Sequence, residues 1–153
     1  MTPLDSRHLT LLRVHYAILG LALVAGLTAA DLLWKPRPWA PGGSLIGMGV
    51  LLLILLVLLF APRRYRAWGY LRGEDELTVK HGLMVRKLTV VPFGRVQHID
   101  IAQGPLQRMM GLATLVLNTA GTRGAAVKLP GLDHRDAEAL RDHVRGQIRQ
   151  DLM

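Results

Sequence analysis

Two long apolar stretches in the N-terminal part of the chain decide how the rest is organised. Residues 14–34 and 43–61 contain one acidic side chain, Asp31, and no Lys or Arg. At about 1.5 Å per helical residue, each stretch can cross a hydrocarbon core of about 30 Å. The pattern predicts two transmembrane helices, at 14–34 and 43–61, joined by an external loop at 35–42, with a cytoplasmic segment at 1–13 and a cytoplasmic domain at 62–153.

Positive charges around the two stretches predict the orientation of the chain. Three arginines, Arg63, Arg64 and Arg66, follow the second stretch at once, whereas the loop between the stretches carries only Lys35 and Arg37. Flanks rich in Lys and Arg stay in the cytoplasm. Both termini are therefore predicted to be cytoplasmic.

The first stretch also has an alternative interpretation as a secretory signal peptide. Arg7 and Arg13 precede it, and the small residues at 28–30 resemble a cleavage site. The apolar core is long for a signal peptide, so the transmembrane interpretation is preferred. If the first stretch were removed, the second would still anchor the domain.

After residue 66 the hydrophobic pattern changes to the period of two that is typical of strands. Residues 76–80 alternate, and His81-Gly82 offers a tight turn into a strand at 83–91. The apolar spacing shifts within 95–101, which predicts a β-bulge or a change of face there. Further strands are predicted at 113–119 and 125–129, after a turn or short helical piece at 106–111. About seven short strands in all predict a small antiparallel barrel or sandwich.

A C-terminal helix completes an α+β fold. Asp133 is a good N-cap, and an apolar stripe follows it at helical spacing, which predicts that the helix packs on the barrel. The stripe consists of Ala137, Leu140, Val144 and Ile148. A parallel basic stripe, Arg141, Arg145 and Arg149, is interpreted as a solvated face, with a lipid or partner contact as the alternative.

Charge favours an acidic partner at the membrane. Residues 63–153 contain fifteen Lys and Arg against nine Asp and Glu, a net charge of about +6. Anionic lipid attracts each nearby basic side chain by about 1 kcal/mol. Nucleic acid is disfavoured, because the tether holds the domain at a lipid surface and no nucleic-acid-binding motif is present. The candidate lipid or partner contacts are Arg63, Arg64, Arg66, Lys80, Arg86, Lys87 and Arg95.

The sequence lacks the parts of a recognisable active site or metal site. It has no cysteine, and no P-loop, G-x-S-x-G or Rossmann motif. His134 lies beside Asp133 and Asp136, which a helix N-terminus explains, and His98 lies beside Asp100 in a predicted strand. We expect no catalytic residue, no metal and no cofactor.

Several short motifs carry a resemblance to a known family. They are VPFGRVQHID at 91–100, QGPLQR at 103–108, GLATL at 111–115, NTAG at 118–121 and PGLDHRDAEAL at 130–140. With two spans before them and a helix after them, the chain resembles the bacterial pleckstrin-homology-like (PH domain) membrane proteins of YdbS type. The motif residues are Gln97, Gly104, Pro105, Leu106, Gln107, Arg108 and Gly111.

The resemblance implies a barrel of two sheets closed by the C-terminal helix, in a protein of the bacterial cytoplasmic membrane. It also implies a non-enzymatic role, often shared with a larger companion protein that carries several such domains. The first hypothesis is an adaptor or subunit of a membrane protein assembly, which binds such a partner or a second copy of itself. The second is a module that binds or senses anionic lipid, and the third an accessory to a lipid or envelope-precursor enzyme.

The motif residues also have structural interpretations. Gly104-Pro105 and Gly111 are predicted to fix turns. The leucines of this region, Leu106, Leu112, Leu115 and Leu117, are predicted to fill the core. The polar motif residues Gln97, Gln103, Gln107 and Arg108 either pair with neighbouring groups, which we favour because buried amides need partners, or form a binding face.

Overall fold

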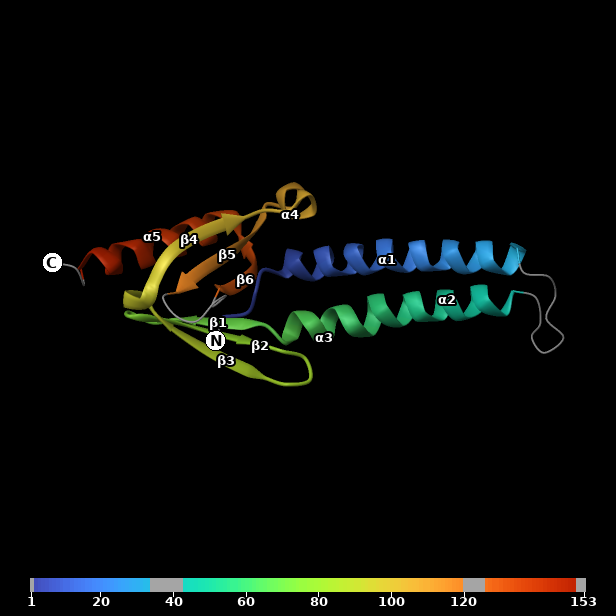
Figure 1. The fold of residues 1–153 in the computed structure, drawn as a ribbon, viewed down its shortest axis with the longest axis horizontal. Coiled ribbons are helices and arrows are strands. Elements are labelled where there is room, and N and C mark those ends of the chain that lie inside the picture. Colours follow the sequence, from blue (N-terminus) through green and yellow to red (C-terminus); the bar gives the residue numbers. More distant parts are fainter. Residues whose placement is uncertain (1, 34–42, 120–125, 151–153) are drawn as a thin grey trace. The chain divides into compact units, whose positions relative to one another are not determined.

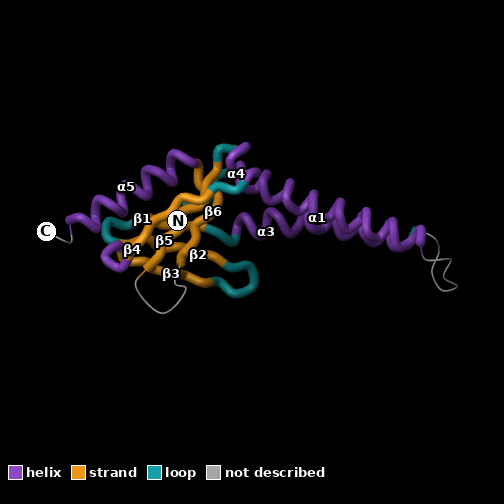
Figure 2. The backbone as a smooth tube through the Cα atoms, turned by 45° about the horizontal axis from the view of Figure 1, so that its top comes forward, coloured by secondary structure: helices purple, strands orange, loops and turns teal. Residues whose placement is uncertain are grey.

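The chain divides into two compact units, each described here by itself. In the computed structural model the described residues are 2–33, 43–119 and 126–150. For residues 149 and 150 only the backbone is described. One unit, called the helical unit, consists of Leu9–Arg63. The other, called the β domain, combines Met1–His8 with Arg64–Met153 (Figures 1 and 2).

The first apolar helix is longer than the sequence predicts. Helix α1 (Ser6–Leu33) starts eight residues before residue 14, because the Asp5 carboxylate accepts the Arg7 backbone N–H at 2.8 Å and caps the helix. The second helical run consists of α2 (Ser44–Leu55), the π-helical turn η1 (Leu56–Phe60) and α3 (Ala61–Arg66). By length and composition, Ser6–Leu33 and Ser44–Arg66 can each cross a membrane.

The second helix continues through Pro62, which the sequence placed at its end. Proline has no N–H, and its ring clashes with the carbonyl four residues earlier in a regular α-helix. The wider turn η1 comes directly before Ala61 and Pro62. Such π turns relax the regular ladder, so the helix continues to Arg66.

Glycines let the two apolar helices pack closely within the helical unit. A Cβ atom on Gly20 would lie 2.2 Å from Leu53 Cδ1, and one on Gly49 would lie 2.9 Å from Leu27 Cδ1. A larger residue at either position would require Leu53 or Leu27 to move, so both glycines support the close approach of the helices.

The β domain contains two three-stranded antiparallel sheets. The first has the order β1 (Gly69–Arg72), β2 (Glu76–His81), β3 (Lys87–Pro92), and the second β4 (Val96–Ala102), β5 (Leu112–Thr119), β6 (Ala126–Asp133). The described residues therefore form six strands rather than about seven. The predicted bulge is confirmed, since the β4–β5 register shifts between Val96 and His98. The turn η2 (Phe93–Arg95) links the sheets, and the predicted helical piece is α4 (Pro105–Met109).

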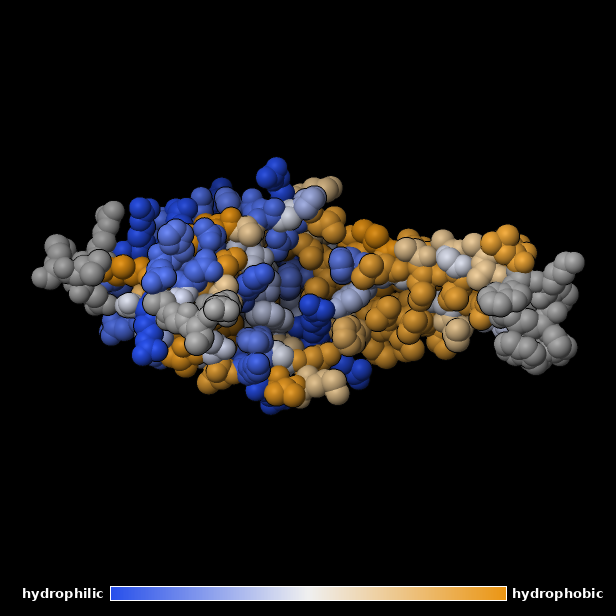
Figure 3. Space-filling model, viewed as in Figure 1, coloured by the Kyte–Doolittle hydropathy of each residue, from blue (hydrophilic) through white to orange (hydrophobic). Residues whose placement is uncertain are grey.

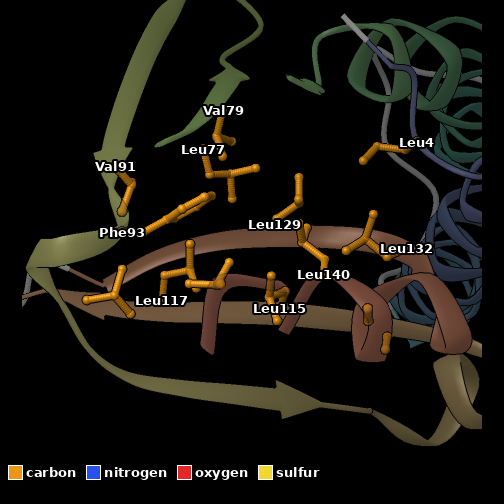
Figure 4. Close-up of a cluster of buried hydrophobic side chains, with 14 residues drawn as sticks. Leu4, Leu77, Val79, Val91, Phe93, Leu115, Leu117, Leu129, Leu132 and Leu140 are labelled. Atoms are coloured by element: carbon orange, nitrogen blue, oxygen red, sulfur yellow. The ribbon is translucent and has the colours of Figure 1, made fainter. Parts of the chain in front are cut away.

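One hydrophobic core lies between the sheets and under helix α5 (His134–Gln150) (Figure 4). The helix is capped as predicted, because Asp133 Oδ1 accepts the Arg135 N–H at 2.9 Å. Its apolar stripe also packs as predicted, with Val144 fully buried. Leu112, Leu115 and Leu117 are buried, whereas Leu106 is only half-buried.

The residues before the first helix form part of the β domain. Leu4 is 3% exposed and belongs to the core cluster. Thr2 pairs with Tyr70, and the Asp5 N–H donates to the Gly131 carbonyl at 3.0 Å. The Tyr65 hydroxyl donates to the Leu4 carbonyl at 2.6 Å. No pattern in the sequence of residues 2–8 predicts this docking.

The connection between β2 and β3 is a longer loop than the tight turn predicted at His81-Gly82. His81 pairs with Lys87, so residues 82–86 belong to neither strand. Gly82 has φ +113°, and a Cβ there would lie 1.9 Å from the Val85 carbonyl oxygen. Glycine is therefore required at this position.

Candidate interaction surfaces

The predicted basic contacts do not form one site. Arg86 and Lys87 lie where β3 begins, whereas Arg95 lies in η2, beyond the other end of that strand. Six residues of strand span about 16 Å. Lys80 and Lys87 belong to adjacent cross-strand pairs, Lys80 with Leu88 and Lys87 with His81. Because adjacent positions in a strand point to opposite faces, Lys80 and Lys87 point to opposite faces of the first sheet.

The remaining predicted contacts lie along the second helix. Arg63 is the last residue of the helical unit. Arg64 and Arg66, at the end of α3, already belong to the β domain. These arginines lie in the last turn of a candidate span, so they contribute to membrane orientation whether or not they contact a ligand.

Lys87 lines a pocket of about 330 Å³ that is formed by Trp68 and by residues of the first sheet and of β6 in the second sheet. The pocket is lined by Trp68, His81, Lys87, Thr89, Ala126, Val127 and Lys128. Trp68 stacks on His81, with ring centroids 5.3 Å apart and the planes inclined by 27°. Two lysines and a histidine make this pocket basic.

The loop between β2 and β3 exposes three consecutive apolar side chains, called the hairpin tip. Leu83, Met84 and Val85 are 40%, 96% and 72% exposed. Figure 3 shows hydrophobic residues along this margin of the domain, over β3 and the hairpin. The last residue of β2 before the loop is His81, and the Trp68 ring stacks on its imidazole.

The hairpin tip lies at the end of the β domain where the chain continues into the apolar helices. The backbone N–H of Trp68 donates to the Tyr65 carbonyl at 3.3 Å. This bond connects the residue that stacks on His81 to α3. Tyr65 is bonded in turn to Leu4, just before α1.

A groove lies between the second sheet and the C-terminal helix. We call it the β4–α5 groove; its volume is about 460 Å³, and it is lined by Val96, Gln97, His98, Ile99, Arg141, Arg145 and Ile148. Strand β4 is at the edge of its sheet and pairs only with β5 among the described strands. Val96 follows η2 directly, and η2 follows the end of β3, so the groove is at the opposite end of β3 from the hairpin tip.

The lining of the β4–α5 groove is apolar and basic. Val96 is buried and Ile99 and Ile148 are half-buried, whereas Gln97 and Arg145 are exposed. Arg141 donates to the carboxylate of its neighbour Asp142 at 2.9 Å. No acidic side chain is among the groove residues that the structure describes. The side chain of Arg149, the third member of the basic stripe, is outside the described part.

The amides of the family motif have local hydrogen-bond partners. Gln103 Nε2 donates to the Leu112 carbonyl at 2.8 Å. Gln107 Oε1 accepts the Gly104 N–H at 3.0 Å, and its Nε2 donates to Thr114 Oγ1 at 2.9 Å.

The other motif residues either shape the backbone or are exposed. Pro105 begins α4, and Gly111 ends the following turn with φ +67°. Arg108 is exposed on α4, and Gln97 differs from the other amides because it lines the β4–α5 groove.

An ion-pair cluster that the sequence analysis missed holds the N-terminal segment on the domain. Arg7 Nη2 contacts the carboxylates of Asp5 and Asp133, and Nη1 donates to the Met110 carbonyl at 3.2 Å. Hydrogen bonds from Arg7 hold the pKa of Asp5 and of Asp133 below the usual range. Arg7 had been interpreted only as a basic flank, because nothing local in the sequence connects it to residue 133.

The histidines do not form a recognisable catalytic arrangement. Asp100, the neighbour of His98, accepts a hydrogen bond from Asn118 Nδ2 at 3.1 Å. His134 Nε2 is 3.7 Å from Glu138 on the same exposed helix face. Within 2–33, 43–119 and 126–148, no group of three or more His, Asp or Glu side chains could hold a metal ion.

Comparison with known proteins agrees with this architecture. The family model described as Bacterial PH domain matches residues 12–148. The UPF0699 transmembrane protein YdbS of Bacillus subtilis (strain 168) is 34% identical over 107 residues, which cover 70% of this chain and 65% of that protein. The chain thus spans a little less than two thirds of that relative's length. No solved structure matches. The chain belongs to the bacterial PH domain family and is a membrane protein with two candidate spans.

Proposed function

We propose that the protein is a non-enzymatic, membrane-anchored adaptor whose β domain binds a partner membrane protein, or a second copy of itself, on the cytoplasmic side. The observation that carries the proposal is the β4–α5 groove, which combines an open strand edge, an apolar floor and two arginines. This combination suits a polypeptide better than a small metabolite.

An extended segment of the partner can add to β4 as a further strand. An edge strand offers unpaired backbone N–H and C=O groups, which give affinity, while side-chain pockets beside it give specificity. Val96 and Ile99 receive apolar side chains of the segment, and Arg145 receives an acidic one. The groove and the hairpin tip lie at opposite ends of β3, so a partner bound in the groove does not cover the hairpin tip.

The packing of the N-terminal segment supports a cytoplasmic location for both termini. Leu4 is in the core of the β domain and Asp5 bonds to Gly131, so the segment before the first span must be on the same side of the membrane as the domain. Two crossings meet that requirement. Cleavage of the first stretch as a signal peptide would remove Leu4 from the core. The arginines after the second span favour the cytoplasmic side.

Anionic-lipid binding remains the second candidate function. The observation that favours it is the basic character of the hairpin base, where Arg86 and Lys87 are exposed beside the hairpin tip. Such attraction weakens as ionic strength rises, whereas an apolar protein interface persists. No observation among the described residues favours the third candidate, an accessory role to a lipid or envelope-precursor enzyme.

Site-specific photocrosslinking in the native membrane tests the adaptor proposal. A benzophenone amino acid at Gln97, in the groove, is compared with one at Ala139, which is exposed on α5 outside the groove. We expect one defined polypeptide to crosslink from position 97 and not from position 139.

The crosslinking is combined with purification of the intact protein in mild detergent at low and high salt. The variant Arg145→Glu is expected to reduce recovery of the same polypeptide at least tenfold, and Arg135→Glu, on the same helix outside the groove, to leave it unchanged. Equal crosslinking from both positions, or recovery only of anionic lipid that is lost at high salt, would contradict the adaptor proposal.

A further inference from the structure

We propose that the hairpin tip inserts into the membrane that holds the helical unit, at the boundary between headgroups and acyl chains. The inference is independent of the adaptor proposal. It also differs from headgroup recognition, because it rests on apolar side chains rather than on charge.

The hairpin tip has the composition of a lipid-inserting loop. Met84 is 96% exposed and Val85 is 72% exposed. Among the described residues of the β domain, no other two consecutive apolar side chains are as exposed. Exposed apolar side chains are common singly, but a projecting group of them marks an interaction site. Arg86 and Lys87 follow directly. When apolar side chains enter a bilayer, neighbouring Lys and Arg side chains keep their charged ends at the lipid phosphates.

The base of the loop is held by ordered pairs. Strands β2 and β3 pair continuously from Glu76 with Pro92 to His81 with Lys87. Trp68 stacks on His81 immediately below the loop. The apolar side chains are therefore displayed on a rigid support and not on an unpaired tail.

The position of the hairpin tip selects lipid as the occupant. Trp68 is two residues after Arg66, where the second candidate span ends, and two residues reach at most about 7 Å. The base of the hairpin is thus tied to the point at which the chain leaves the membrane. Tryptophan is also a typical side chain of the membrane interface.

A second exposed apolar side chain repeats the arrangement at the other connection to the helical unit. Met109 on α4 is 83% exposed and follows the exposed Arg108. The next residue, Met110, accepts a hydrogen bond from Arg7, near the start of α1. Each of the two connections therefore has near it an exposed apolar side chain that is followed or preceded by an arginine.

Single-cysteine labelling of the full chain tests the proposal, because the native sequence contains no cysteine. An environment-sensitive fluorophore is placed at Met84→Cys or, as a control, at Glu74→Cys in the exposed β1–β2 connection at the opposite end of the first sheet. Each protein is reconstituted in lipid nanodiscs that contain spin-labelled lipid, either zwitterionic or with an anionic fraction. We expect the label at 84 to be blue-shifted and quenched at least threefold more than the label at 74, in both lipids and at high salt.

A second variant separates insertion from simple proximity. Val85→Asp is expected to reduce quenching at position 84 to the level at position 74, whereas Val90→Asp, an exposed valine on β3, leaves it unchanged. Equal quenching of the labels at 84 and 74 overturns the proposal. Quenching confined to anionic nanodiscs and lost at high salt also overturns it, in favour of headgroup attraction, as does protection of position 84 only after a partner protein is added.

Discussion

Replacing Gly131 by alanine tests whether the N-terminal segment is an integral part of the β domain. Gly131 has φ +71°, and a Cβ there would lie 2.4 Å from His8 Cγ. The left-handed conformation costs an alanine about 1–2 kcal/mol, and the overpacking against a ring adds about 1–3 kcal/mol. The free energy of unfolding of the β domain is expected to fall by about 2–5 kcal/mol.

A second glycine provides the matched control. Gly111 has φ +67°, but a Cβ there would meet only the flexible end of Arg7, at 3.3 Å. Gly111→Ala should therefore lower the free energy of unfolding by the backbone cost alone, about 1–2 kcal/mol. Adding His8→Ala to Gly131→Ala should recover part of the loss, because it removes the ring that the new methyl group strikes.

The assay uses the accessibility of one buried thiol. Val144 is fully buried in the core, so in the otherwise cysteine-free chain Val144→Cys reacts with a thiol reagent only when the domain opens. With opening and closing fast relative to labelling, Gly131→Ala should raise the labelling rate by about 30- to 5,000-fold, and Gly111→Ala by about 5- to 30-fold. Equal rates for the two glycine variants, together with no recovery by His8→Ala, would show that the N-terminal segment is not docked on the domain.

Three further predictions concern the same domain. Leu4→Ala should lower the free energy of unfolding by about 2–4 kcal/mol, because it empties a core position that is 3% exposed; a change below about 0.5 kcal/mol, the usual range for surface substitutions, would contradict its burial. Gln103→Leu leaves a carbonyl of β5 without its 2.8 Å donor and should cost about 1–3 kcal/mol in the same thiol assay; an unchanged rate would mean that water replaces the amide. Because Arg7 lowers the pKa of Asp5 and Asp133, their contribution to stability is complete above the unfolded pKa of about 3.9 and is lost as the pH falls through the lower folded pKa. The melting temperature in detergent should thus fall on acidification below about pH 4, less steeply in Arg7→Met, and identical slopes would refute the role of Arg7.

Features that depend on neighbouring residues could be predicted from the sequence. The cap at Asp133 and the apolar stripe through Val144 have a helical period, and the bulge near Val96 is visible as a shift in apolar spacing. A π-helical turn before Pro62 has no comparable signal, because it depends on how the helix absorbs the missing N–H.

One local backbone conformation and the features that depend on distant residues could not be predicted. Leu83–Val85 was interpreted as strand because it is apolar, although the backbone of Gly82 ends the ladder at His81. The β4–α5 groove joins two segments whose sequences are polar or amphipathic by themselves, so Arg145 was interpreted as solvated. Leu4 is one leucine in a polar segment, and only the fold brings it to the core.

Docking of residues 2–8 on the rest of the β domain also has a consequence for biosynthesis. Arg7 and its partner Asp133 are 126 positions apart, so at about 5–20 residues per second the ribosome needs about 6–25 s to make the second after the first. During that interval both spans must enter the membrane while the nascent domain exposes the site that Leu4 later fills. This segment is made before the rest of the β domain but is among the last parts to reach its native position. A bulky fusion at its N-terminal end should therefore delay maturation and increase capture by chaperones and proteases more than the same fusion at the C-terminus.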